Sequence, residues 1–140
     1  MVYRKYDNTY VVRLEIGEEV LTCLKKLALD EKITLAYVTG IGATNDATLG
    51  VLSIADGKYC SVDVTGDHEI TAIAGNITTM NNEPYLHLHM TLAGIGGAAV
   101  GGHLNKAVIS ATAEIFVTVL DGVVDRFKST EGPRLNLLKL

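Results

Sequence analysis

The chain has 140 residues, enough for one domain and too few for two of ordinary size. Apolar residues make up 48% of it and charged residues 20%, a balance that allows a buried core. Twelve basic and sixteen acidic residues give a formal net charge of −4. No run of Lys or Arg offsets this charge, so composition argues against nucleic acid as the partner.

The sequence predicts a cytoplasmic protein that does not enter a membrane. Cys23 and Cys60 lack CxxC spacing and further cysteine partners, which favours reduced thiols. The first seven residues lack the apolar core of a signal peptide. The longest apolar stretch, 93–102, is half glycine and well short of the roughly 18 residues that a membrane helix needs.

A strand and then a helix are predicted near the N-terminus. Residues 10–16 alternate, with Arg13 on one face and Leu14 and Ile16 on the other. In residues 18–31 the apolar side chains recur at three- and four-residue spacing. The segment begins with Glu18 and Glu19, whose negative charges suit the N-terminus of a helix. This segment is therefore predicted to be the main helix.

The rest of the chain is predicted to be almost wholly β, with strands over 33–39, 47–54, 58–64, 69–79, 85–92, 99–104 and 114–120. Turns are expected at Asp56-Gly57, at Gly66-Asp67 and over 94–97. Residues 107–113 fit a short helix or a bulged strand, and the tail from 123 has no clear pattern. The expected fold class is α+β: an antiparallel-dominated mixed sheet with one main helix near the N-terminus, in a single compact domain.

Three histidines are predicted to converge on one face of a hairpin. His87 and His89 are two residues apart, so their side chains leave a strand on the same side. If the following turn is centred on Gly96, His89 faces His103. Three imidazoles can then reach one ion at Zn–N distances of about 2.0–2.1 Å.

The same pattern also occurs as solvent-facing histidines without a metal, but the hairpin register favours the metal. Three nitrogen ligands suit Zn²⁺, or another borderline divalent ion, and leave one coordination position open. His68 is expected at the surface, away from this cluster. A fourth ligand or general base is sought among Glu114, Asp46 and Glu69, and the sequence does not choose among them.

The segment Gly40-Ile41-Gly42 follows a strand and imitates a dinucleotide-binding fingerprint. The third glycine is missing, and the next residues alternate like a strand instead of opening a helix. A dinucleotide site is therefore rejected. The two glycines are expected to allow a bulge or a tight corner, facing the metal pocket.

Five segments in order resemble the PPC domain, the plants-and-prokaryotes conserved domain: Arg13 to Glu19, Thr39 to Ala43, Gly75 to Ile77, His87 to His89, and Gly101 to Leu104. The resemblance covers a core of about residues 3–120 of a single domain spanning 1–140, with 121–140 as a C-terminal extension. It implies an α+β fold, a homotrimer, and a metal site formed by the three histidines.

Members from plants join this domain to an AT-hook, a short minor-groove binder containing Arg-Gly-Arg. This chain has no Arg-Gly-Arg and no basic arm. The DNA-binding description of prokaryotic members therefore has no basis in these residues.

Three functions remain open from the sequence. The first is a metal protein that binds or transforms a small oxygen-rich molecule, in which Arg13 pairs with a carboxylate and Asn76 or Thr91 supports the metal ligands. The second is a DNA- or chromatin-associated accessory protein with a basic face made of scattered residues: Arg4, Lys5, Lys25, Lys26 and Lys128. The third is a trimeric scaffold in which the metal only stabilises the assembly. No general base stands out in the sequence, so the first does not extend to a named reaction.

Overall fold

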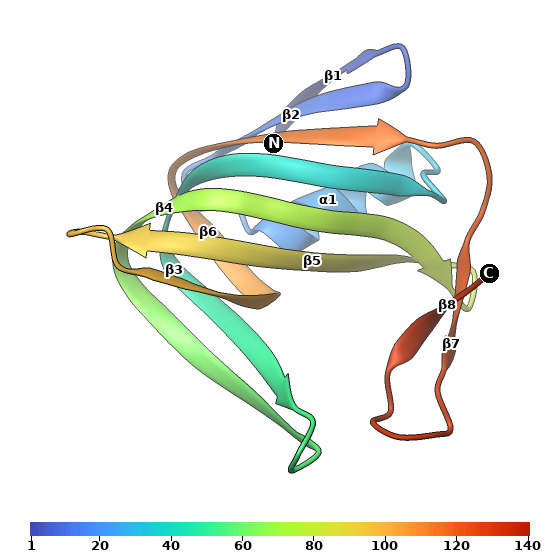
Figure 1. The fold of residues 1–140 in the computed structure, drawn as a ribbon. Coiled ribbons are helices and arrows are strands. Elements are labelled where there is room, and N and C mark those ends of the chain that lie inside the picture. The colour runs from blue at the N-terminus through green and yellow to red at the C-terminus, as the bar shows by residue number, and fades with distance from the viewer.

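The computed structural model describes all 140 residues as one helix and eight strands (Figure 1). The elements in chain order are β1 (Val2–Tyr6), β2 (Thr9–Glu15), α1 (Val20–Asp30), β3 (Ala36–Ser53), β4 (Lys58–Met80), β5 (Glu83–Gly94), β6 (Ala99–Val119), β7 (Asp125–Lys128) and β8 (Asn136–Lys139). The α+β class with one helix near the N-terminus is confirmed.

Four long strands form a closed circuit. β3 pairs with both β4 and β6, and β5 also pairs with both β4 and β6. All of these pairings are antiparallel, while β7 joins β4 in parallel through the pair Thr79 and Asp125. The sheet is therefore mixed and dominated by antiparallel pairs, as predicted.

Helix α1 packs against this sheet and lies behind it in the view of Figure 1. Its buried side chains, Val20, Leu24, Leu27 and Ala28, belong to the 24-residue core cluster. The helix begins later than predicted because Glu19 is its N-cap: the Glu19 carboxylate accepts from the backbone N–H groups of Leu21 and Thr22 at 3.0 and 2.7 Å. At 11 residues, α1 is neither long nor apolar enough to cross a bilayer.

Several boundaries differ from the sequence prediction. Gly66-Asp67 is not a turn between strands but lies inside β4, where Thr44 pairs with His68 and Asp46 pairs with Thr65. β4 therefore carries one more residue than β3 at this point, and Gly66 accommodates the resulting bulge at a φ of 86°. The two strands predicted on either side of this point are one bent strand.

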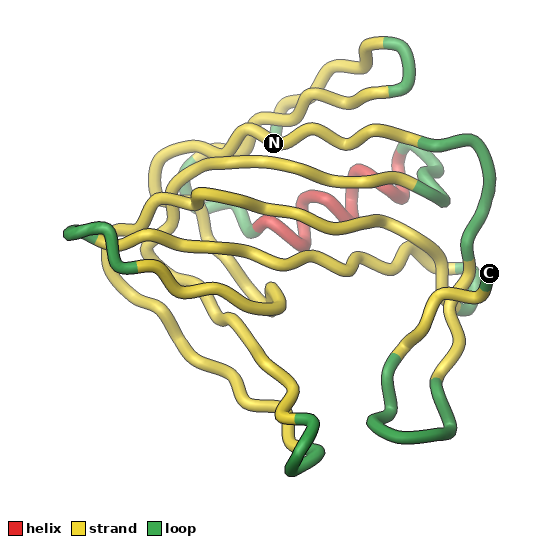
Figure 2. Tube along the Cα trace, in the orientation of Figure 1, coloured by secondary structure: helices red, strands yellow, loops and turns green.

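The predicted strand at 10–16 ends one residue early, and Ile16 is 73% exposed instead of facing the core. Residues 107–113 are strand within β6, which settles the choice between helix and bulged strand. The terminal strand β1 was not predicted. The tail forms the β7–β8 hairpin, whose long connection is visible in Figure 2.

The two faces of strand β5 have different surroundings, one in the core and one on the other side of the sheet. Leu88, Met90 and Leu92 are 1%, 1% and 0% exposed and belong to the core cluster. The alternate residues of β5, which include His87 and His89, project from the other side. The fold thus holds the two histidines on a strand that is anchored by its buried face.

Candidate metal centre

The hairpin between β5 and β6 sets the register of the three histidines. Pairing runs from Ala93 opposite Ala99 to His89 opposite His103. Gly96 lies at the middle of the turn with a φ of 92°, a conformation that glycine adopts without strain. The predicted pairing of His89 with His103 is confirmed.

The three imidazoles lie together. The ring centroids are 5.3 Å apart for His87 and His89, 5.1 Å for His87 and His103, and 5.5 Å for His89 and His103. One nitrogen from each ring lies within 4.8 Å of the others. No protein group hydrogen-bonds to a ring nitrogen of these three residues, whereas the fourth histidine, His68, has such a contact. The cluster could therefore hold a metal ion, because its nitrogens are close together and free of protein partners.

The surroundings of the cluster disfavour protonation of His87 and His103. Burial, followed by the neighbouring His103, Arg126 and His89, lowers the pKa of His87 from 6.5 to about 4. Burial and the adjacent His89 also lower the pKa of His103. A metal-binding imidazole must be unprotonated, so the lowered pKa values of His87 and His103 favour the form that binds an ion.

Gly75 of β4 brings its strand close to β5 at the histidines. A Cβ at this position would overlap the carbonyl oxygen of His87. The next residue, Asn76, pairs with His87 across the two strands. Thr91 follows His89 by two positions and faces Gly101 of β6. Both Asn76 and Thr91 thus lie next to histidines of the cluster, one across the strand pair and one along β5.

Two residues that sequence reasoning missed lie on the β6 side of the cluster. The Tyr59 ring meets the His103 ring edge-on, with centroids 6.4 Å apart. Its hydroxyl donates to Oδ1 of Asn105 at 2.9 Å. Tyr59 reaches this position across β3 because Gly50 leaves room, and a Cβ there would overlap the phenol. Asn105 could have been found from its spacing to His103, but Tyr59 is remote in sequence from all three histidines.

Two further residues that were missed lie on the β4 side. Arg126 of β7 donates through Nη2 to Oδ1 of Asn76 at 2.8 Å. Its guanidinium lies over the ring of Tyr85, 4.7 Å from the centroid. Tyr85 precedes His87 by two positions, so strand alternation could have identified it.

Arg13 and Glu114 do not join the histidines. Arg13 is exposed and pairs with Glu15, with Nη2 2.8 Å from Oε1. Glu114 pairs with Ile41 of β3, whereas His103 pairs with Gly50 of the same strand. The two β3 positions are nine residues apart, so Glu114 is remote from His103. Glu114 and Glu69 instead line a separate cavity of about 560 Å³.

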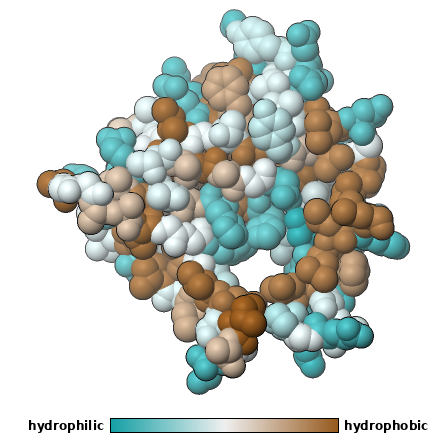
Figure 3. All heavy atoms as spheres, viewed as in Figure 1, coloured by the Kyte–Doolittle hydropathy of each residue, from teal (hydrophilic) through white to brown (hydrophobic).

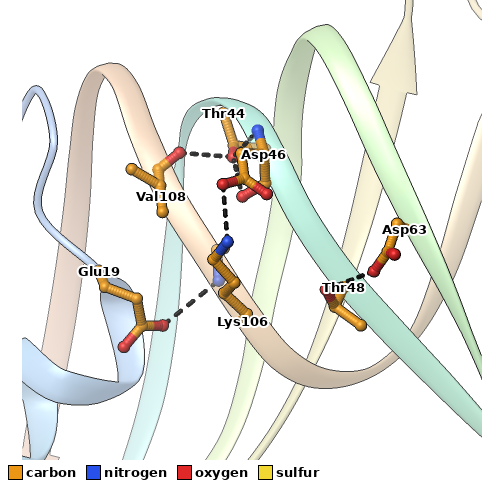
Figure 4. Close-up of polar contacts among 8 residues, drawn as sticks. Glu19, Thr44, Asp46, Thr48, Asp63, Lys106 and Val108 are labelled. Carbon is orange, nitrogen blue, oxygen red and sulfur yellow. Dashed lines mark hydrogen bonds and ion pairs between the residues drawn. The ribbon is translucent and has the colours of Figure 1, made fainter.

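Asp46 is also engaged elsewhere, in the polar contacts of Figure 4. Its Oδ2 lies 2.7 Å from Nζ of Lys106. The neighbouring Thr44 donates from its hydroxyl to the carbonyl of Val108 at 2.6 Å and so joins β3 to β6 where the register shifts. Of the three carboxylates considered as a fourth ligand, none lies in the cluster.

The remaining sequence candidates serve the fold. Nδ1 of His68 contacts the carbonyl of Gly66 at 2.8 Å, and His68 lies outside the cluster as expected. Gly40 and Gly42 lie opposite a bulge, but the extra residue is on β4, between Ile70 and Ile73, and neither glycine pairs with a histidine of the cluster. A Cβ on Gly40 would lie 2.8 Å from the carbonyl oxygen of Glu114, so the glycines allow β3 and β6 to approach closely.

Figure 3 shows the molecule from the side of the sheet opposite α1. A hydrophilic patch lies in the middle of this face, and hydrophobic side chains gather on the β3–β4 and β7–β8 hairpins that flank a hollow beneath it. The exposed apolar residues of these two hairpins include Val51, Ile54, Val62, Phe127, Leu137 and Leu138. The polar centre is thus bordered by apolar surface.

A family model described as the Plants and Prokaryotes Conserved (PCC) domain matches residues 1–121. Among curated proteins, a bifunctional protein GlmU of Synechococcus sp. (strain JA-2-3B'a(2-13)) is 30% identical over 139 residues, covering 94% of this chain and 20% of that protein. The chain therefore spans about a fifth of the length of the curated relatives it matches.

Two solved structures share the fold over nearly the whole chain. A protein from Bacteroides thetaiotaomicron VPI-5482, provisionally described as DNA-binding, superposes with a TM-score of 0.95 at 28% identity, covering 99% of this chain and 96% of that one. A protein from Archaeoglobus fulgidus, described as metal-containing, has a TM-score of 0.85 at 25% identity, with coverage of 98% and 99%.

Proposed function

The chain belongs to the Plants and Prokaryotes Conserved (PCC) domain family, and we propose that it binds a divalent metal ion, preferably Zn²⁺, through His87, His89 and His103. In this proposal the open coordination position takes a small oxygen-rich ligand. The observation that carries it is the convergence of three imidazoles whose nitrogens lie within 4.8 Å of one another and have no protein partner.

The donor set supports zinc over harder or softer ions. Three imidazoles and no nearby thiolate or carboxylate match the nitrogen-rich sites of Zn²⁺ and other borderline divalent metals, and disfavour Ca²⁺ or Mg²⁺. Three protein ligands are typical of centres that bind a further molecule, because structural zinc sites are usually closed by four. The relative from Archaeoglobus fulgidus described as metal-containing agrees with this proposal.

A bound ion would supply a Lewis acid that polarises a ligand oxygen. The chain supplies the walls: Asn76 and Thr91 flank the histidines on β4 and β5, and Tyr59 with Asn105 closes the β6 side. These hydroxyl and amide groups can orient an oxygen-rich molecule by hydrogen bonds.

The metal content of untagged protein tests this proposal. We expect about one zinc per chain in the parent protein after incubation with Zn²⁺ and removal of the excess. His89→Ala should lose the metal, whereas His68→Ala, which removes a histidine outside the cluster, should retain it. A parent protein without metal, or an equal content in all three samples, would contradict the proposal.

We also propose that the functional unit is a homotrimer in the cytoplasm. Ile54 and Val51 on the β3–β4 hairpin are 70% and 60% exposed, and contacts between copies would remove this apolar surface from water. The free thiols Cys23 and Cys60 agree with a reducing compartment. Light scattering should give three times the chain mass, and Ile54→Glu should lower it. A monomeric parent protein would contradict the trimer.

DNA binding is the second candidate, because the relative from Bacteroides thetaiotaomicron is provisionally described in this way. The net charge of −4 argues against it. Fluorescence anisotropy with duplex DNA at increasing salt distinguishes the two: a phosphate-contacting protein loses affinity steeply with salt. Tight, salt-sensitive binding would favour this candidate over the metal centre as the main function.

A further inference from the structure

Arg126 is the only charged side chain that the fold buries, at 6% exposure. No carboxylate lies within ion-pair distance of its guanidinium. Asp125, the adjacent acidic residue, accepts instead from the hydroxyl of Thr79 at 3.1 Å. A buried charge without a counterion is unfavourable, so this arginine requires an explanation.

Neutral groups hold the guanidinium in place. Nε donates to Oγ1 of Thr78 at 2.8 Å, Nη1 to the carbonyl of Asn136 at 2.7 Å, and Nη2 to Oδ1 of Asn76 at 2.8 Å. A guanidinium has five N–H donors. One N–H on each Nη atom is therefore left without a protein acceptor, and the charge is left uncompensated.

This charge lies next to the histidine cluster. Asn76, which accepts from Arg126, pairs with His87 across β4 and β5. Tyr85, which stacks on the guanidinium, lies two positions before His87 on the same side of β5. No acidic side chain lies within ligand distance of the three histidines, and none forms an ion pair with the arginine.

We propose that Arg126 selects an anionic ligand for the three-histidine centre, namely a small organic molecule that carries a carboxylate or phosphate group. This inference rests on the proposed metal centre and names the class of its ligand. An oxygen of the ligand would bind the ion held by the histidines, and the guanidinium of Arg126 would balance the negative charge. Arg126 is a positioning and charge-selecting residue, and it lies outside the residues matched by the family model.

Calorimetry on the zinc-loaded protein tests the inference with two probes of equal size, glycolate and the neutral glycolamide. In Arg126→Met, glycolate affinity should fall by roughly tenfold or more, because the variant loses a charged hydrogen-bond donor to the carboxylate. Glycolamide affinity should change less than about twofold. Arg134→Met removes an exposed arginine from the β7–β8 connection and should match the parent protein for both probes. If Arg126→Met does not fold, Arg126→Gln replaces it, because Gln keeps a donor and removes the charge.

Inorganic phosphate as a third probe separates the two ligand types. Tighter binding of phosphate than of glycolate assigns a phosphate ligand, and the reverse assigns a carboxylate. Zinc content is measured on every sample. If the ratio of glycolate affinity to glycolamide affinity is the same in the parent and Arg126→Met proteins, both loaded with zinc, the inference is overturned and the metal centre stands. Failure of the parent protein to bind zinc would overturn both.

Discussion

Acidifying the metal-free protein should remove stability through His87. Its pKa lies at about 4 in the folded protein and near 6.5 in the unfolded chain. Between these values the unfolded chain binds the proton more readily, so stability is fully present above about pH 6.5 and is lost as the pH falls towards 4. The lowering corresponds to at most about 3 kcal/mol, and solvent screening around a partly exposed ring reduces this to roughly 1–2 kcal/mol.

Urea denaturation at pH 7 and pH 4.5, in the presence of a chelator, measures this effect. His87→Gln should lose less stability between the two pH values than the parent protein, by roughly 1–2 kcal/mol. His68→Gln removes a histidine outside the cluster and should follow the parent. Carboxyls with lowered pKa values, such as Glu18 and Glu31, also lose stability in acid, but they contribute equally to all three proteins. An identical loss in the parent and His87→Gln would refute the reasoning.

Three further changes test how the fold supports the centre. Gly75→Ala should lower zinc affinity in calorimetry by tenfold or more, because the new Cβ would overlap the carbonyl oxygen of His87 and push β4 from β5; unchanged affinity would contradict that contact. Leu88→Ala should lower the free energy of unfolding in urea by about 2–5 kcal/mol, since this side chain is 1% exposed beneath the histidines; a loss below about 1 kcal/mol would count against its role in the core. Glu19→Ala should cost about 1–2 kcal/mol in the same assay, because the carboxylate caps α1 and also accepts from the N–H of Ala107; wild-type stability would show that the cap is dispensable.

Local patterns in the sequence were sufficient to predict the central cluster. Alternation along one strand placed His87 and His89 on the same side, and a turn centred on Gly96 aligned His89 with His103. Both inferences use only neighbours along a strand and across one hairpin, where geometry is nearly invariant.

The parts that the sequence did not reveal depend on contacts between distant segments. Tyr59 meets His103 only because β4 and β6 both pair with β3 and Gly50 leaves space between them. Arg126 lies in a tail without clear periodicity, and its place beside Asn76 follows from the pairing of β7 with β4.

Glycines explain the main errors in the predicted strands. Gly66 satisfies the same conformational requirement in a bulge as in a hairpin turn, so the sequence alone did not distinguish them. Gly40 and Gly42 were expected to face the metal pocket, yet they serve the close contact of β3 with β6. In each case the residue type indicated an unusual backbone but not which segment it approaches.

Zinc K-edge X-ray absorption of the zinc-loaded, untagged protein tests the three-histidine centre most directly. For an ion held by His87, His89 and His103, we predict three imidazole nitrogens at about 2.0–2.1 Å and fewer oxygen than nitrogen neighbours. A sulfur scatterer at about 2.3 Å, which would implicate Cys23 or Cys60, or a shell made only of oxygen, would contradict it.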